Sequence, residues 1–143
     1  MTELELIALA KEARTHAYVP YSGYAVGAAL LTKAGKVYQG ANIENAAFGP
    51  TNCAERTAFF TAVFQGEREF EAIAVVGGKA GEELSGFFPP CGVCRQVMRE
   101  FCDPEEFRII LGAGTGEKQV YLLKELLPLS FGPDNLNGKE KHS

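Results

Sequence analysis

The stretch Thr51–Ala58, with the sequence TNCAERTA, places a cysteine at the start of a predicted helix and a glutamate two residues later. A second stretch, Pro89–Gln96 (PPCGVCRQ), places two cysteines at the start of another predicted helix. Cys91 and Cys94 of this second stretch are expected on one helical face with about 5–6 Å between their Cβ atoms, which suits two ligands of one ion. The two stretches therefore predict two helix N-termini docked side by side, and the rest of the fold has to bring them together.

The thiols of Cys53, Cys91 and Cys94 are candidate ligands of a zinc ion. Three thiolates fill three of the four tetrahedral positions around zinc and leave one for water. Helix N-termini favour thiolate over thiol, because exposed N–H groups and the positive end of the helix dipole lower the pKa of cysteine. Glu55 is not a ligand in this arrangement and can move protons while water activated by zinc attacks a substrate. These residues indicate a hydrolytic zinc site.

Two arginines and a fourth cysteine follow the candidate ligands. Three thiolates and one zinc ion carry one negative charge overall, and Arg56 and Arg95 are close enough in sequence to moderate it. Cys102 follows Cys94 by eight residues, which corresponds to about 12 Å along a continuous helix. A zinc–sulfur bond of about 2.3 Å cannot bridge that distance. We therefore predict that Cys102 belongs to the core and that the metal site stays open.

Length and composition limit the class of protein. The chain has 143 residues, of which 46% are hydrophobic and 22% charged, so that one soluble globular domain with a sizeable core is expected. The net charge of −4 gives no support to a surface that binds nucleic acid. No run approaches the roughly 18 apolar residues of a membrane span, and the first residues do not form a signal peptide. We expect a cytoplasmic protein, in which cysteines favour metal binding or catalysis over disulfides.

Predicted strands and helices alternate after an initial hairpin. Thr2 and Glu5 form a capping box that opens a first helix, which ends at about residue 17. Helical periodicity predicts the two cysteine helices at about 52–65 and 91–101, and a short helix from about 124. Gly77–Ser85 is predicted to be a surface loop. Strands are predicted at 25–32, 36–40, 72–76, 107–111 and 119–122. This order predicts an α/β fold in three layers, with helices on both faces of a sheet.

At these motifs the chain resembles the cytidine deaminase family, in particular its small homotetrameric branch with three cysteine ligands. Cys53-Ala54-Glu55 stands where other branches have His-x-Glu, and the second stretch matches the P-C-x-x-C motif. Further matching motifs are PYS at 20–22, VGAAL at 26–30 and NIENA at 42–46. The resemblance implies a single α/β/α catalytic domain over residues 1–131 with a mixed central sheet. A polar, flexible tail is expected over residues 132–143.

The resemblance also implies the roles of the residues around the metal. Cys53, Cys91 and Cys94 would hold one zinc ion per subunit. Glu55 would take a proton from the attacking water, pass it to N3 of the pyrimidine and help ammonia leave from C4. Arg56 matches an arginine that hydrogen-bonds to the ligand sulfurs.

Three further positions match the part of the family's site that binds substrate. Asn42 and Glu44 match the pair that binds the ribose, and an amide beside a carboxylate suits a hydroxyl that both donates and accepts. The backbone of Ala54 is expected to help hold the base.

Three aromatic positions also match the family, two of them with a different residue. Tyr24 stands where relatives often have a phenylalanine that stacks near the base. Phe48 stands where a tyrosine is often found, so that a hydrogen bond across subunits would be missing. Phe131 matches an aromatic residue that reaches into a neighbouring subunit's active site in tetrameric relatives. The resemblance therefore implies a homotetramer whose active sites are shared between subunits.

The activity that the resemblance implies is hydrolysis of the 4-amino group of cytidine and deoxycytidine in pyrimidine salvage. One alternative is an aminohydrolase for a nucleoside-like antibiotic such as blasticidin S, but Asn42 and Glu44 favour a ribose-bearing substrate. A deaminase that edits polynucleotides is disfavoured by the acidic charge and the lack of a basic–aromatic stretch. A non-catalytic protein with a structural zinc would have a closed four-ligand site and would be indifferent to the loss of Glu55.

Overall fold

The computed structural model describes residues 1–137 of the chain. Its elements are α1 (Glu3–Arg14), β1 (Tyr24–Thr32), β2 (Val37–Ala41), α2 (Ala54–Phe64), β3 (Phe70–Lys79), α3 (Gly92–Phe101), β4 (Arg108–Gly112), β5 (Lys118–Leu122), α4 (Leu123–Leu126) and α5 (Pro133–Asn137). Of the predicted flexible tail, residues 138–143 lie outside the described part, and residues 133–137 form α5. No helix within the described part is long and apolar enough to span a membrane.

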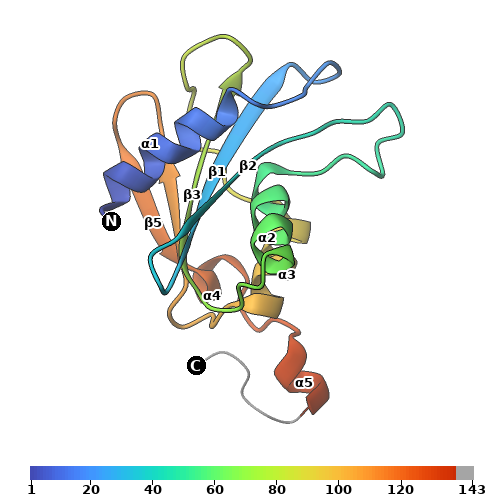
Figure 1. The fold of residues 1–143 in the computed structure, drawn as a ribbon, viewed down its shortest axis with the longest axis vertical. Coiled ribbons are helices and arrows are strands. Elements are labelled where there is room, and N and C mark those ends of the chain that lie inside the picture. Colours follow the sequence, from blue (N-terminus) through green and yellow to red (C-terminus); the bar gives the residue numbers. More distant parts are fainter. Residues whose placement is uncertain (138–143) are drawn as a thin grey trace.

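Within residues 1–137, five strands form one sheet in the order β2-β1-β3-β4-β5 (Figure 1). β3 and β4 run parallel, and the other neighbouring pairs are antiparallel. The β1–β2 pair is the predicted hairpin, with Gly35 in its turn at a φ of 94°, a conformation that glycine adopts without strain. The predicted mixed sheet is thus confirmed.

β3 is longer than the predicted strand at 72–76, and the prediction of a surface loop at 77–85 is wrong for residues 77–79. These three residues continue the antiparallel pairing with β1. A Cβ atom at Gly77 would lie 2.6 Å from Cγ of Phe88, so the missing side chain makes room for that ring against the strand. Glycine has a low intrinsic preference for strands, and the local pattern therefore indicated a loop where tertiary packing extends the sheet.

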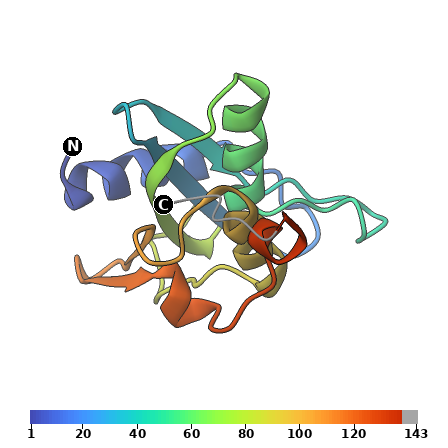
Figure 2. The same ribbon diagram turned by 90° about the horizontal axis from the view of Figure 1, so that it is seen from below.

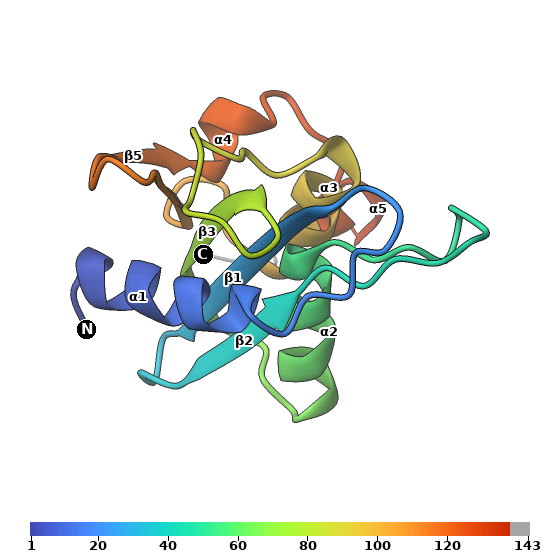
Figure 3. The same ribbon diagram turned by 90° about the horizontal axis from the view of Figure 1, so that it is seen from above.

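Helices cover both faces of the sheet (Figures 1 and 3). α1 packs on one face, and α2 and α3 share a core with the other. Successive residues of β1 point to opposite faces, so that Ala28 and Leu30 belong to the core under α2 and α3 while Ala29 and Leu31 belong to the core under α1. All four side chains are at most 5% exposed. The predicted three-layer arrangement is confirmed.

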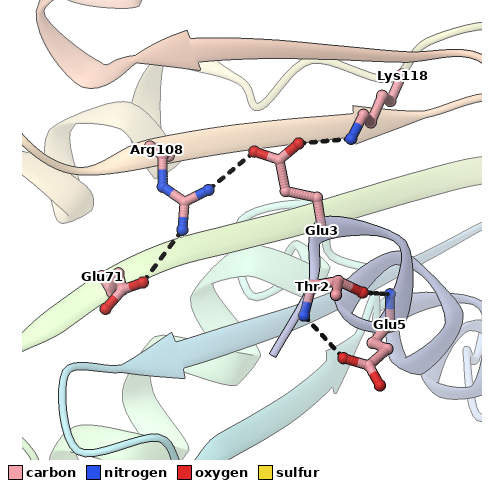
Figure 4. A network of polar contacts seen from close by, with 6 residues as sticks. All are labelled: Thr2, Glu3, Glu5, Glu71, Arg108 and Lys118. Carbon is pink, nitrogen blue, oxygen red and sulfur yellow. Dashed lines mark hydrogen bonds and ion pairs between the residues drawn. The ribbon is translucent and has the colours of Figure 1, made fainter.

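Polar contacts fix the beginning of α1 (Figure 4). The predicted capping box at Thr2 is present. Glu3 accepts hydrogen bonds from Arg108 of β4 at 2.8 Å and from Lys118 of β5 at 2.7 Å. Arg108 also donates to Glu71 of β3 at 3.2 Å. These contacts tie the first turn of α1 to the three strands β3, β4 and β5.

Candidate active site

The N-termini of α2 and α3 bring the candidate zinc ligands together. Cys53 and Cys91 are the N-cap residues of the two helices, both with extended backbones, and neither side chain caps its helix. Cys94 lies in the first turn of α3. The three Sγ atoms all lie within 4.8 Å of one another. We call these three residues the thiol cluster.

β2 sets the position of α2 by a close backbone contact. A Cβ atom at Gly40 would lie 2.4 Å from the carbonyl oxygen of Ala54 and 2.5 Å from the amide nitrogen of Ala58. Only a residue without a side chain allows this approach. Gly40 therefore allows the first turns of α2, and with them the thiol of Cys53, to pack directly against the edge of the sheet.

The geometry of the thiol cluster fits zinc. Two sulfurs on one tetrahedral zinc ion, each at about 2.3 Å, lie about 3.8 Å apart. The Sγ atoms of Cys53 and Cys91 are 3.8 Å apart. In the described part of the chain no fourth histidine, cysteine or carboxylate joins the group, so one tetrahedral position stays open. Cys102, at 2% exposure, belongs to the core as predicted.

The electrostatics of the thiol cluster favour a cation. The pKa of Cys53 is lowered to about 5, mainly by a hydrogen bond from Cys94 and further by Arg56. The pKa of Cys94 is raised, because it donates that hydrogen bond and is buried. The thiol of Cys94 therefore resists ionisation beside the Cys53 thiolate, and a bound metal ion would supply the positive charge that stabilises both as thiolates.

Arg56 lies against the cluster, as the resemblance implies. Its Nη2 donates to Sγ of Cys53 at 3.3 Å. Its Nε is buried and has no hydrogen-bond partner within the described residues. The guanidinium thus contacts a sulfur although one of its own N–H groups stays unsatisfied, which is uncommon for a buried polar group. Arg95, the second arginine predicted near the sulfurs, instead donates to the carbonyl oxygens of Pro90 and Leu126, each at 2.7 Å.

Glu55 is a buried carboxyl group beside the thiol cluster. It lies in the first turn of α2 and is 4% exposed. Its negative charge is one of the causes that raise the pKa of Cys94, which places the carboxyl group close to that thiol. Burial raises the pKa of Glu55 to about 7, and the negative charge of Cys53 adds to the effect. A buried carboxyl group with a pKa near neutrality can both accept and donate a proton, which is the property of a general acid–base catalyst.

Asn42 and Glu44 lie on the segment between β2 and α2, which projects from the body of the molecule (Figures 1 and 3). Oδ1 of Asn42 accepts from the amide of Val26, and Nδ2 donates to the carbonyl of Tyr24, both at 2.9 Å. Glu44 lines an open pocket of about 340 Å³, which contains none of the three cysteines. The residues that line it are Tyr21, Ser22, Glu44, Asn45, Phe48 and Thr51.

Ser22 has no role predicted from the sequence, although its hydroxyl contacts Glu44 directly. The PYS motif at 20–22 was the available signal, but the partner lies 22 residues further along the chain. A contact between two loops leaves no periodic pattern in the sequence, so only the fold could show it.

The remaining substrate-binding candidates differ in exposure. Ala54, the first residue of α2, is fully buried. Tyr24, at the start of β1, is 43% exposed, with its ring centroid 6.4 Å from that of Phe88. Phe48 is 78% and Phe131 58% exposed. These rings are accessible in a single chain.

The segment that carries Phe131 is bound to α3, and Figure 2 shows α5 beside that helix. Gln96 donates to the backbone oxygen of Phe131 at 2.9 Å. Arg99, which is 8% exposed, donates to Ser130 at 2.9 Å and to Asp134 at 2.6 Å. α3 therefore carries two of the thiols and also anchors the C-terminal segment.

The fold and the site together define a class of α/β proteins, in which two helix N-termini form an open three-thiol metal site beside a buried carboxyl group. The family described as "Cytidine and deoxycytidylate deaminase zinc-binding region" matches residues 1–109. The chain belongs to the cytidine deaminase family and is an enzyme of that family.

Individual relatives match over nearly the whole chain. The cytidine deaminase of Halalkalibacterium halodurans is 51% identical over 132 residues, which cover 92% of this chain and 96% of the relative. That of Sporosarcina psychrophila is 47% identical over 133 residues, 93% of each chain. The crystal structure of cytidine deaminase from Burkholderia pseudomallei superimposes with a TM-score of 0.84 at 50% identity, covering 92% of this chain and 100% of the other. The structure from Mycobacterium tuberculosis gives a TM-score of 0.77 at 36% identity, covering 92% and 98%.

Proposed function

We propose that this protein catalyses the zinc-dependent hydrolytic deamination of cytidine and deoxycytidine to uridine and deoxyuridine, with release of ammonia. The observation that carries the proposal is the buried carboxyl group of Glu55 next to the thiol cluster. Relatives named cytidine deaminase, at 47% and 51% identity, support the choice of substrate.

The protein's own residues have distinct tasks in this reaction. The residues that would hold zinc are Cys53, Cys91 and Cys94, and the metal when bound supplies a Lewis acid that makes water nucleophilic near neutral pH. Glu55 takes a proton from the attacking water, delivers it to N3 of the pyrimidine, and then assists the departure of ammonia from C4. Arg56 orients Cys53 and offsets the negative charge of the sulfurs.

Substrate recognition falls to the residues between β2 and α2 and at the start of β1. Asn42 and Glu44 bind the ribose, because each keeps hydrogen-bonding capacity beyond its contacts within the chain. The backbone of Ala54 holds the base, and the exposed ring of Tyr24 stacks near it.

The proposal extends to the assembly. The catalytic domain spans residues 1–131 and binds one zinc ion per subunit. Four copies form a cytoplasmic homotetramer that acts in pyrimidine salvage and shares its active sites through Phe131. The exposure of Phe48 and Phe131 supports a partner at these rings. Sedimentation that shows a stable, fully active monomer would refute the shared sites.

The test is ammonia release from cytidine by the zinc-loaded protein and by zinc-loaded Glu55→Gln. Loss of the proton carrier is expected to lower kcat about 10²–10⁴-fold at unchanged zinc content. Glu12→Gln, at an exposed glutamate of α1, is the matched control and should retain full activity. A zinc-loaded protein that leaves cytidine, deoxycytidine and blasticidin S all unchanged would favour a structural zinc site instead.

A further inference from the structure

The carboxylate of Glu44 is held by a two-residue turn on another part of the chain. Its Oε1 accepts hydrogen bonds from the backbone N–H groups of Tyr21 and Ser22, both at 3.0 Å. Its Oε2 accepts from the hydroxyl of Ser22 at 2.5 Å. The carboxylate is therefore fixed by three donors that come from a segment more than 20 residues away in sequence.

These donors leave Glu44 with little spare capacity. An ionised carboxylate offers about four acceptor positions, two on each oxygen. Both positions on Oε1 and one on Oε2 are filled, so one position on Oε2 remains. The hydrogen bond from Ser22 is the main cause that lowers the pKa of Glu44, which keeps the group an ionised acceptor.

Asn42 is restricted in a similar way. Its amide pairs with β1, as Oδ1 accepts from Val26 and Nδ2 donates to Tyr24. One N–H and one acceptor position remain on the amide. A hydroxyl group that donates to Glu44 and accepts from Asn42 would use one position on each side chain.

We propose that Ser22 is a positioning residue, whose hydroxyl locks the carboxylate of Glu44 so that it offers one acceptor position to a single sugar hydroxyl of the substrate. The inference rests on the proposed function. Cytidine and 2′-deoxycytidine share the 3′- and 5′-hydroxyls, and of these the 3′-hydroxyl is the one that the locked carboxylate receives. Ser22 and Glu44 line the same open pocket.

Ser22 links this lock to Tyr24. Its Oγ also accepts a hydrogen bond from the amide of Tyr24 at 3.0 Å. Loss of the hydroxyl could thus disturb the turn as well as the carboxylate, and the experiment has to separate the two effects. A disturbed turn alters binding of every cytosine nucleoside, whereas an unlocked carboxylate alters only substrates with a 3′-hydroxyl.

The experiment compares kcat and KM of the intact zinc-loaded enzyme, Ser22→Ala and Ser22→Thr for 2′-deoxycytidine and 2′,3′-dideoxycytidine. For Ser22→Ala we expect kcat/KM for 2′-deoxycytidine to fall about tenfold, mainly through KM, and that for 2′,3′-dideoxycytidine to change less than about twofold. Ser22→Thr keeps the hydroxyl, so its ratio of kcat/KM for 2′-deoxycytidine to kcat/KM for 2′,3′-dideoxycytidine should stay close to that of the intact enzyme. Glu44→Gln gives the effect of losing the carboxylate, and Ser85→Ala, at an exposed serine of the loop after β3, is the matched control.

Two outcomes would overturn the inference while the proposed function stands. An equal loss for both nucleosides in Ser22→Ala would show that Ser22 does not act through the 3′-hydroxyl of the substrate. Unchanged kinetics for both nucleosides would show that the backbone donors alone position Glu44. A zinc-loaded intact enzyme without activity on cytidine is a separate result, because it refutes the proposed function, on which the inference rests.

Discussion

The two halves of the candidate site differ in what holds them. The thiol cluster and Glu55 form a catalytic half that is built into the core, with Cys94 at 1% and Glu55 at 4% exposure on two helix N-termini. The recognition half, comprising Tyr24, Asn42, Glu44, Phe48 and Phe131, lies on turns, segment ends and exposed rings. A single chain therefore brings the proposed reacting groups together by itself. The proposed recognition residues are held by hydrogen bonds between loops, and their exposed rings leave room for a partner.

The largest effect is expected from breaking the catalytic half. Cys94→Ala removes a buried ligand, so we expect zinc content to fall well below one ion per chain and activity to fall at least about 1,000-fold. Cys102→Ala is the matched control at the other buried cysteine, with a loss of about 1–2 kcal/mol of stability and unchanged zinc content. Metal analysis and ammonia release measure both variants. Equal zinc loss in the two variants would contradict the assignment.

Metal removal tests the same half without changing a residue. A strong zinc chelator is expected to abolish activity and to lower the free energy of unfolding, by about 4 kcal/mol where free zinc had exceeded its Kd a thousandfold. Zinc should restore both properties and magnesium neither, because thiolates are soft ligands. Activity and urea denaturation report the result, and recovery with magnesium would argue against a thiolate site.

Gly40 tests how the core positions the catalytic half. Gly40→Ala places a methyl group against the backbone of α2, so we expect a loss of about 1–3 kcal/mol in the free energy of unfolding and weaker zinc binding. A Cβ atom at Gly49 would meet no atom within 4 Å beyond its chain neighbours, and the φ of Gly49 is not positive. Gly49→Ala should therefore change stability by less than about 0.5 kcal/mol. Urea denaturation compares the two variants, and equal stability of both would show that β2 does not seat α2.

The smallest effect is expected in the recognition half. Phe131→Ala should raise KM for cytidine about tenfold while zinc content and kcat per zinc ion stay nearly unchanged, because the exposed ring lies outside the core. Steady-state kinetics and sedimentation measured on the same preparation check this expectation. Unchanged KM in an intact tetramer would remove Phe131 from the site.

The catalytic half could be predicted from sequence because its signals are local. In the sequence, Cys53 stands two residues before Glu55, and Cys91 stands three residues before Cys94, each pair at the start of a predicted helix. The structure brings all three sulfurs within 4.8 Å of one another. The order of strands and helices likewise predicted a sheet with helices on both faces, and the two cores on either side of β1 confirm it. The roles of these residues in binding zinc and moving protons remain proposals.

The recognition half could not be predicted in the same way, because it depends on contacts between distant segments. The carboxylate of Glu44 is held by hydrogen bonds from Tyr21 and Ser22, more than 20 residues earlier in the chain. The sheet shows a similar case, because the extension of β3 through Gly77 depends on the position of Phe88. Arg95 was expected near the sulfurs but binds backbone carbonyls, since its direction is set by packing and not by sequence distance. Only the three-dimensional structure shows such contacts.

The most direct test of the open three-thiol site is zinc X-ray absorption spectroscopy of the purified protein. We predict three sulfur neighbours at about 2.3 Å and one lighter ligand at about 2.0–2.2 Å, which leaves a position for the reaction beside Glu55. Four sulfur neighbours would mean that a further cysteine closes the site. That result would contradict a hydrolytic centre and favour a structural zinc ion.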